Sequence, residues 1–193
     1  MIMEDVYNTI CKYTNLNMKY SDVKLFSKSY FEDNYYHNIS NKNIAFTIKI
    51  NNEILIVINM EKFKILNDET KKFIVIHELV HAFSYRKYKF KDISGIESAY
   101  YNSKEFEKLN EAYTNVISRY IYYELYKKPY NERKNNYEIY LKKILRKYSQ
   151  KKIFKIYFYE SPLYFFRLCC QRLKIFSYDQ LSRKLKILEK NIM

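Results

Sequence analysis

Residues 67–88 read NDETKKFIVIHELVHAFSYRKY, and this stretch decides the fold. Asn67, followed by Asp68 and Glu69, is typical of a helix start, because a capping side chain and acids in the first turn stabilise free backbone amides. Apolar residues then recur at helical spacing, so we expect a helix from about 68 to 88. Since they cover much of its circumference, this helix should be central rather than superficial.

Two runs rich in β-branched residues precede this helix. Residues 44–50 and 53–60 flank the turn-forming pair Asn51-Asn52. Alternating β-formers around such a pair predict a β-hairpin. Before the hairpin, the pattern indicates only a helix near residues 3–13.

Helical periodicity continues through most of the remaining chain. After a connection over 89–101, we expect further helices over 102–126, 131–148, 150–158 and 162–174, and a last one opened by Ser177 and Gln180.

The predicted fold class is therefore α+β, mainly α. A small β-hairpin or sheet should pack on the central helix and be followed by a helical C-terminal part. Pro129 is the only reasonable boundary between two parts of the chain, because no flexible linker is present. It gives a first part of residues 1–128 and a basic helical extension of residues 129–193, which could also pack together as one single domain.

The basic charge of the chain is concentrated at one end. The 193 residues carry a formal net charge of +14, and residues 127–193 alone hold 18 Lys/Arg against 5 Asp/Glu. An anionic partner, such as nucleic acid, anionic lipid or an acidic protein, could bind there. The more ordinary explanation is that long lysine and tyrosine side chains coat solvated helix faces.

The sequence carries only weak signals of where in the cell the protein is located. The first residues lack a basic region followed by an apolar one, so no secretory signal is visible. No uncharged apolar run approaches the length of a membrane span. The odd set Cys11, Cys169 and Cys170 does not suggest a disulfide framework. We expect a cytoplasmic protein, with export by a non-classical route as the alternative.

Two of the three histidines lie in the string His77-Glu78-Leu79-Val80-His81. Residues four apart share one face of a helix, about one turn from each other, so two imidazoles can converge on one Zn²⁺. Glu78 can reach a water in the open position of such a metal without becoming a ligand, which makes it the natural general base. Zinc would lower the pKa of that water to about 7.

A catalytic zinc normally has three protein ligands and a water, so a third donor is needed. Residues 110–115 read Asn-Glu-Ala-Tyr-Thr-Asn. With the His77–His81 string, this stretch resembles the gluzincin metallopeptidases, the thermolysin-like ones included, whose third ligand is a Glu in an Asn-Glu-x-x-Ser/Thr-Asp-like stretch on a following helix. The resemblance implies Glu111 as the third ligand and Asn115 as the residue orienting a zinc-bound imidazole.

The chain departs from that family pattern in two respects. The family often has an acid at the position of Asn115, and the 30 residues from His81 to Glu111 exceed the spacing familiar from thermolysin-like enzymes. A tyrosine or histidine commonly stabilises the tetrahedral intermediate, and the tyrosines nearest to Glu111 in sequence are Tyr100, Tyr101 and Tyr113. By analogy with the same group, strand 53–60 could bind an extended peptide along its edge.

The sequence thus predicts a zinc-dependent peptidase, a hydrolase of the HExxH metalloprotease type, with one catalytic Zn²⁺ and a protein or peptide substrate. The alternative is a nucleic-acid-binding or regulatory protein with a non-catalytic zinc site and basic C-terminal helices. Structural zinc sites usually have four ligands with paired cysteines, and the three cysteines lack that spacing. A degenerate peptidase kept as a binding module would more plausibly have lost Glu78 or a histidine.

Overall fold

The protein is described by a computed structural model that covers residues 2–16, 18–35, 42–88, 91–96, 104–131 and 135–190. Their contacts divide the chain into two units. Helices dominate and two small sheets accompany them, so the predicted class, α+β and mainly α, is confirmed. The first unit consists of Met1–Phe83 and Ser118–Tyr130, and the second of Ser84–Ile117 and Asn131–Met193.

A three-stranded sheet with the order β1-β3-β2 lies in the first unit. Strand β1 (Val23–Ser27) runs parallel to β3 (Glu53–Ile58), and β2 (Ala45–Ile50) runs antiparallel to it. The predicted hairpin of β2 and β3 is confirmed. Its turn residues Asn51 and Asn52 have φ angles of 48° and 68°, a region that asparagine tolerates better than most residues.

The two faces of this sheet bury alternate residues of β3. On one face, Leu55 and Val57 form a cluster with Phe31 of α2 (Lys28–Asn34), a helix that the sequence pattern does not indicate. On the other face, Ile56 is fully buried beside helix α4. Strand β3 is therefore covered on both sides, which explains its unbroken apolar sequence.

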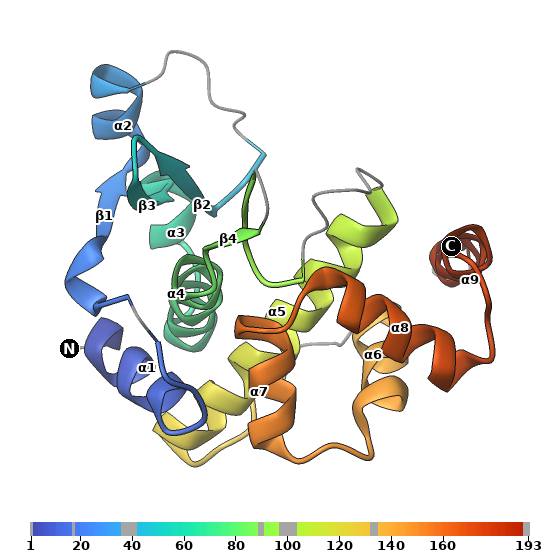
Figure 1. The fold of residues 1–193 in the computed structure, drawn as a ribbon. Coiled ribbons are helices and arrows are strands. Elements are labelled where there is room, and N and C mark those ends of the chain that lie inside the picture. Colours follow the sequence, from blue (N-terminus) through green and yellow to red (C-terminus); the bar gives the residue numbers. More distant parts are fainter. Residues whose placement is uncertain are drawn as a thin grey trace. The chain divides into compact units, whose positions relative to one another are not determined.

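Helix α4 (Asp68–Phe83) is the central helix of the first unit, as predicted. It contacts β2, β3 and α1 (Ile2–Cys11), and Figure 1 shows it next to these elements. The prediction of a helix to residue 88 is wrong beyond Phe83, because Arg86–Tyr88 forms strand β4 and pairs with β5 (Lys91–Ile93). The unit also contains η1 (Tyr20–Asp22), α3 (Met60–Lys64) and the last part of α5 (Lys104–Tyr126).

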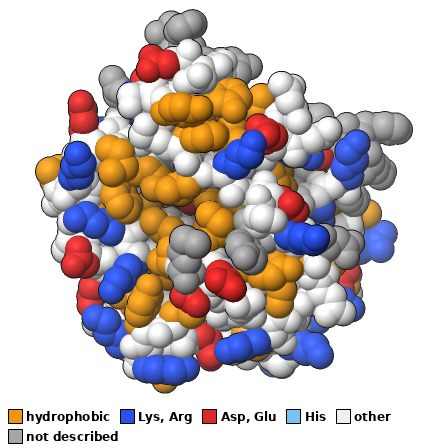
Figure 2. Space-filling view, turned by 90° about the vertical axis from the view of Figure 1, so that its left-hand side faces the viewer, with side chains coloured by type: hydrophobic (Ala, Val, Ile, Leu, Met, Phe, Trp, Pro, Cys, Tyr) orange, Lys and Arg blue, Asp and Glu red, His pale blue; other side chains and the backbone are white. Residues whose placement is uncertain are grey.

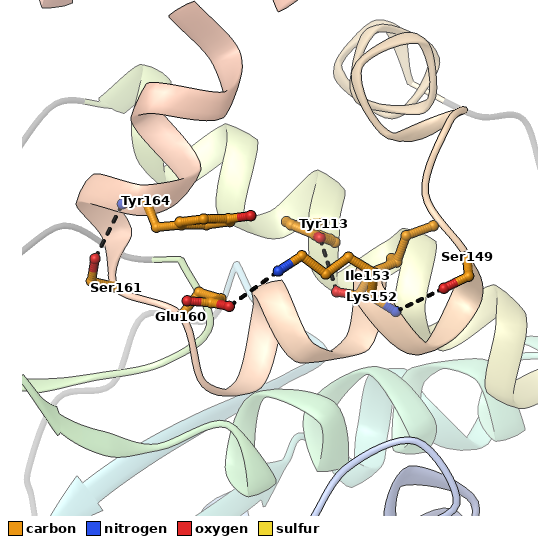
Figure 3. Close-up of polar contacts among 7 residues, drawn as sticks. All are labelled: Tyr113, Ser149, Lys152, Ile153, Glu160, Ser161 and Tyr164. Carbon is orange, nitrogen blue, oxygen red and sulfur yellow. Dashed lines mark hydrogen bonds and ion pairs between the residues drawn. The ribbon is translucent and has the colours of Figure 1, made fainter. Parts of the chain in front are cut away.

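The second unit contains the β4-β5 pair, the first part of α5 and four further helices. Serines 149 and 161 cap two of them by accepting hydrogen bonds from the amides of Lys152 and Tyr164 (Figure 3), and these two helices start at the predicted residues. The predicted helix over 131–148 is shorter in the structure. The four helices are α6 (Asn136–Leu145), α7 (Gln150–Phe158), α8 (Pro162–Leu173) and α9 (Tyr178–Lys190).

A half-buried arginine joins β4 to the end of α7. The Arg86 guanidinium donates to the carbonyl oxygens of Ser84 (3.2 Å), Gly95 (2.6 Å), Tyr157 (3.2 Å) and Glu160 (2.8 Å). Burial lowers the pKa of Arg86 to about 10, which leaves it charged at neutral pH. Two of its acceptors lie at the C-terminal end of α7, where a cation is favourable.

Gly95 occupies a position in this network that no other residue fits. Its φ angle is 60°, and an added Cβ would lie 2.5 Å from Asn110 Oδ1 and 2.5 Å from the Tyr157 ring. The backbone on both sides is held, because the Gly95 amide donates to Ser84 Oγ and the Ile96 amide to Asn110 Oδ1. Gly95, the one glycine of the chain, is therefore required for two reasons: its φ angle is positive, and a Cβ atom has no room there.

Replacing Gly95 by alanine should lower the free energy of unfolding by about 2–4 kcal/mol, because it adds both a disfavoured φ angle and an overpacked methyl group. Urea denaturation followed by circular dichroism measures this. Asn51→Ala is the matched control: Asn51 also has a positive φ but is exposed, so only the conformational cost of about 1 kcal/mol remains. Equal losses in both variants would contradict the steric argument.

Two further predictions concern disulfides and membrane-spanning helices. Cys11, Cys169 and Cys170 are all free thiols, which agrees with the expected lack of a disulfide framework. Within the described ranges, no helix combines the length and the apolar content needed to cross a membrane.

Candidate metal centre

The two histidines of α4 converge at one point. His77 and His81 lie on the same face one turn apart, and their Nε2 atoms are 3.2 Å from each other. Their rings are inclined by 70° with centroids 4.8 Å apart. His81 is buried and His77 is half-buried. The predicted spacing therefore brings two imidazole nitrogens together at a site that is partly shielded from water.

This convergence fits a tetrahedral zinc ion. Zn–N distances of about 2.0–2.1 Å and a tetrahedral angle would place two ligand nitrogens about 3.3 Å apart. The observed separation of 3.2 Å agrees with that value. Binding of an ion would require both nitrogens in their unprotonated form.

Glu78 lies between the histidines, and its side chain is anchored. It is 7% exposed. Thr47 Oγ1 of β2 lies 2.7 Å from Glu78 Oε2 and 3.0 Å from the carbonyl oxygen of the same residue. The hydroxyl has one proton, so it donates to one oxygen at a time. The hydrogen bond to the carboxylate is the shorter and the stronger of the two.

Thr47 is a site residue that the sequence analysis did not identify. Period-two alternation along β2 places Thr47 on the face opposite the aromatic and aliphatic row of Phe46 and Ile48. A short polar side chain on the α4-facing side of an apolar strand is a signal that could have pointed to it. The sequence alone does not say which residue of α4 lies against that strand.

A packed aromatic group supports the helix one turn before His77. Phe73 stacks on Tyr130 with ring centroids 3.9 Å apart. The Arg119 guanidinium lies over both rings, at 5.4 Å and 5.3 Å, and donates to the Tyr130 carbonyl oxygen. Phe73 is 6.5 Å from the ring of His77. These contacts restrict the rotation of α4 and hence the direction of its histidines.

Glu111 is the residue that the resemblance implies as the third ligand. It is exposed and is located in the first part of α5, which belongs to the second unit. The two histidines and Glu78 belong to the first unit. Coordination of one ion by Glu111 together with the histidines stays a prediction.

The residues around Glu111 have structural roles. Asn110 accepts from the Ile96 amide through its side chain, and Thr114 Oγ1 is 2.6 Å from the Tyr157 hydroxyl. Burial raises the pKa of Tyr157, so this hydroxyl stays protonated. Asn115 lies one turn after Glu111 and is half-buried. Its action on a zinc-bound imidazole stays a prediction.

The structure narrows the choice of an oxyanion donor. Tyr113 is fully buried in the second unit, where its hydroxyl donates to the Ile153 carbonyl oxygen at 3.0 Å (Figure 3). It is therefore not available to a substrate. Tyr100 and Tyr101, the other two candidates, lie outside the described residues.

The analogy that assigned peptide binding to the edge of strand 53–60 is wrong for this strand. In the sheet, β3 pairs with β1 on one side and with β2 on the other, so its backbone groups are already used. A hairpin pattern alone cannot show this, because β1 comes from a distant part of the sequence.

Comparison with protein-family models, with curated proteins and with solved structures finds no match. The likeness to gluzincins therefore rests on the residues of α4 and of the 110–115 stretch.

Proposed function

We propose that this chain is a zinc-dependent peptidase. One observation carries the proposal: on one buried helix, two imidazole nitrogens converge to 3.2 Å and the carboxylate between them is oriented by a threonine from the neighbouring strand. A merely structural histidine pair would not need that carboxylate. The group of potential ligands includes no cysteine, which argues for an open catalytic site over a closed structural one.

Three side chains would hold the ion, and a fourth would move protons. His77, His81 and Glu111 are the proposed ligands, the set of two histidines and one glutamate known from catalytic zinc sites. Bound zinc would supply a Lewis acid for the peptide carbonyl and a lowered pKa for water.

Glu78 is the proposed general base and then the general acid. With Oε2 held by Thr47, Oε1 would take the proton from the attacking water and would later transfer it to the leaving amine. The buried setting of Glu78 keeps competing water away from this carboxylate. Cytoplasmic location and a protein or peptide substrate belong to the same proposal.

The test begins with elemental analysis of the purified, zinc-loaded chain, which should contain about one zinc ion. The loaded chain is then incubated with a mixture of synthetic peptides, and cleavage is followed by mass spectrometry. Removal of the ion by a chelator should stop cleavage, and added zinc should restore it. A folded chain that takes up no zinc, or cleavage that persists after chelation, would overturn the proposal.

Replacing Thr47 by valine should lower kcat about tenfold while KM changes little. A charge-assisted hydrogen bond to Glu78 is lost, and the base leaves its productive orientation. Thr47→Ser keeps the hydroxyl and should retain most of the activity. Steady-state kinetics on a cleaved peptide measures both variants. If serine and valine are equally slow, Thr47 acts by packing and does not position the base.

A further inference from the structure

One stretch of the second unit carries many cations and no acid. Residues 139–159 contain seven lysines and arginines and neither aspartate nor glutamate. The stretch runs along α6, through the turn that follows it, and along α7. Over residues 140–158, the exposed side chains are those of Ser149 and of five cations, Lys143, Arg146, Lys147, Lys151 and Lys155. This surface therefore presents positive charge without negative charge.

The acids at the two ends of this stretch are not available to the five cations. Glu138 is only 2% exposed. Glu160 Oε1 accepts a hydrogen bond from Lys152 Nζ at 3.2 Å (Figure 3). None of the five exposed cations forms an ion pair with a residue that the structure describes. Ion pairs within the described chain therefore do not offset the repulsion among these cations.

The first unit shows a different arrangement of charge. Several of its lysines form ion pairs with acidic side chains: Lys24 with Glu53, Lys28 with Glu32, Lys71 with Asp68, Lys127 with Glu124 and Lys128 with Glu69. Figure 2 shows a face of the molecule on which blue and red side chains lie interspersed. The unpaired cations of residues 143–155 differ from this mixed pattern, so a lysine-rich composition alone does not explain them.

The five cations follow one corner of the chain. Lys143 and Arg146 lie three residues apart at the end of α6, and Lys151 and Lys155 lie four apart on α7, so each pair shares a side of its helix. The opposite side of each helix is buried. Lys147 lies between the two pairs. Successive cations are at most four residues apart, which corresponds to about 14 Å or less.

Backbone bonds and a ring contact hold this corner. The Tyr148 amide donates to the Leu145 carbonyl oxygen at 2.8 Å, and Ser149 caps α7. The Arg172 guanidinium of α8 lies over the Tyr148 ring, 5.2 Å from its centroid, which adds a sixth cation at the same place. We call this group the basic corner, and its members are Lys143, Arg146, Lys147, Lys151, Lys155 and Arg172.

Helix α7 begins with cations where acids are favourable. Lys151 and Lys152 lie in its first turn, which contains no acid. The positive end of the helix dipole repels cations and attracts anions. The protein therefore carries an unfavourable charge arrangement at the basic corner, and a bound anion would relieve it.

We propose that the basic corner binds the phosphate backbone of a nucleic-acid duplex without reading its sequence. A duplex carries one negative charge per about 1.7 Å of its axis, so each cation can reach a phosphate. Lysine, arginine and serine side chains commonly contact phosphates. An anionic membrane would also require apolar anchors, and no exposed residue over 140–158 supplies one. An acidic protein would need carboxylates at matching positions.

The first test is the salt dependence of binding by the full-length wild-type chain. A fluorescein-labelled DNA duplex of about 20 base pairs is titrated at about 50–200 mM salt, and fluorescence anisotropy is recorded. Five or six phosphate contacts should give a slope of about −5 in a plot of log K against log salt concentration. Two duplexes of unrelated sequence should bind within about threefold of each other.

Charge reversal at the basic corner is the second test. Lys147→Glu combined with Lys151→Glu should weaken binding by about tenfold or more and reduce the slope to about −3, because two phosphate contacts are lost. This variant should melt at the same or a higher temperature, because it removes repulsion and places a carboxylate in the first turn of α7. Weaker binding by a chain that is no less stable excludes unfolding as the cause.

The matched control is Lys12→Glu combined with Lys64→Glu. Both lysines are exposed residues of the first unit, and the net charge changes by the same amount. This variant should bind within about threefold of the wild type. Equal losses in the two double variants, no binding of the duplex by the wild type, or tighter binding to phosphatidylserine vesicles or to polyglutamate would overturn the proposal. Removal of zinc by a chelator should change none of these results, so the outcome is independent of the proposed peptidase activity.

Discussion

Replacing Glu78 by glutamine is expected to abolish peptide hydrolysis while zinc stays bound. Glutamine fills the same volume and can still face Thr47, but its amide cannot take a proton from water. Loss of a general base typically lowers kcat by about 10²–10⁴-fold. The histidine pair does not depend on the carboxylate, so the zinc content should remain that of the wild type.

The measurement combines zinc analysis and peptide cleavage on the same preparation. Glu78→Asp is the informative companion, because it keeps a carboxylate but moves it back by one methylene, and it should retain part of the activity. Wild-type rates in the glutamine variant would refute the assigned base. Loss of both zinc and activity would show that Glu78 supports the ion and would equally contradict the role proposed here.

Replacing His81 by alanine is expected to remove the metal. One of two converging nitrogens disappears, and a site with only two remaining ligands cannot retain the ion at ordinary concentrations. Elemental analysis should fall from about one zinc per chain to less than about 0.1. His77→Ala should give the same result, since both imidazoles contribute an Nε2 atom at the same point.

Glu111 is tested in the same series. Glu111→Ala should keep the two histidines but weaken zinc binding by about 10–100-fold, as measured by competition with a chromophoric chelator. Glu107→Ala is the matched control, because Glu107 is also an exposed glutamate of α5, one turn earlier. Equal affinities in Glu111→Ala and the wild type would remove Glu111 from the ligand set and leave a two-histidine site that needs another donor.

The elements that the sequence predicts correctly are those with strong local signals. The hairpin is recognisable because Asn51 and Asn52 accept positive φ angles between two β-branched runs. Helices α7 and α8 begin where Ser149 and Ser161 cap them. The division of the chain at Pro129 into two domains stays a prediction.

The elements that the sequence misses depend on distant partners. Strand β1 is formed by pairing with β3 about 30 residues later, and no local pattern indicates that partner. Residues 86–88 continue the helical pattern of α4, yet they form β4, because Arg86 finds four carbonyl acceptors in the second unit. Tertiary hydrogen bonds outweigh a weak local preference there.

The sequence by itself determined the chemistry that this protein can offer. Two histidines four residues apart on a helix must share a face, whatever surrounds them, since 3.6 residues complete a turn. Only the tertiary structure decided how that chemistry is oriented. The bond from Thr47 to Glu78 joins residues 31 positions apart, and the burial of Glu78 depends on which elements pack against α4. Both depend on packing between elements, which local residue patterns do not encode.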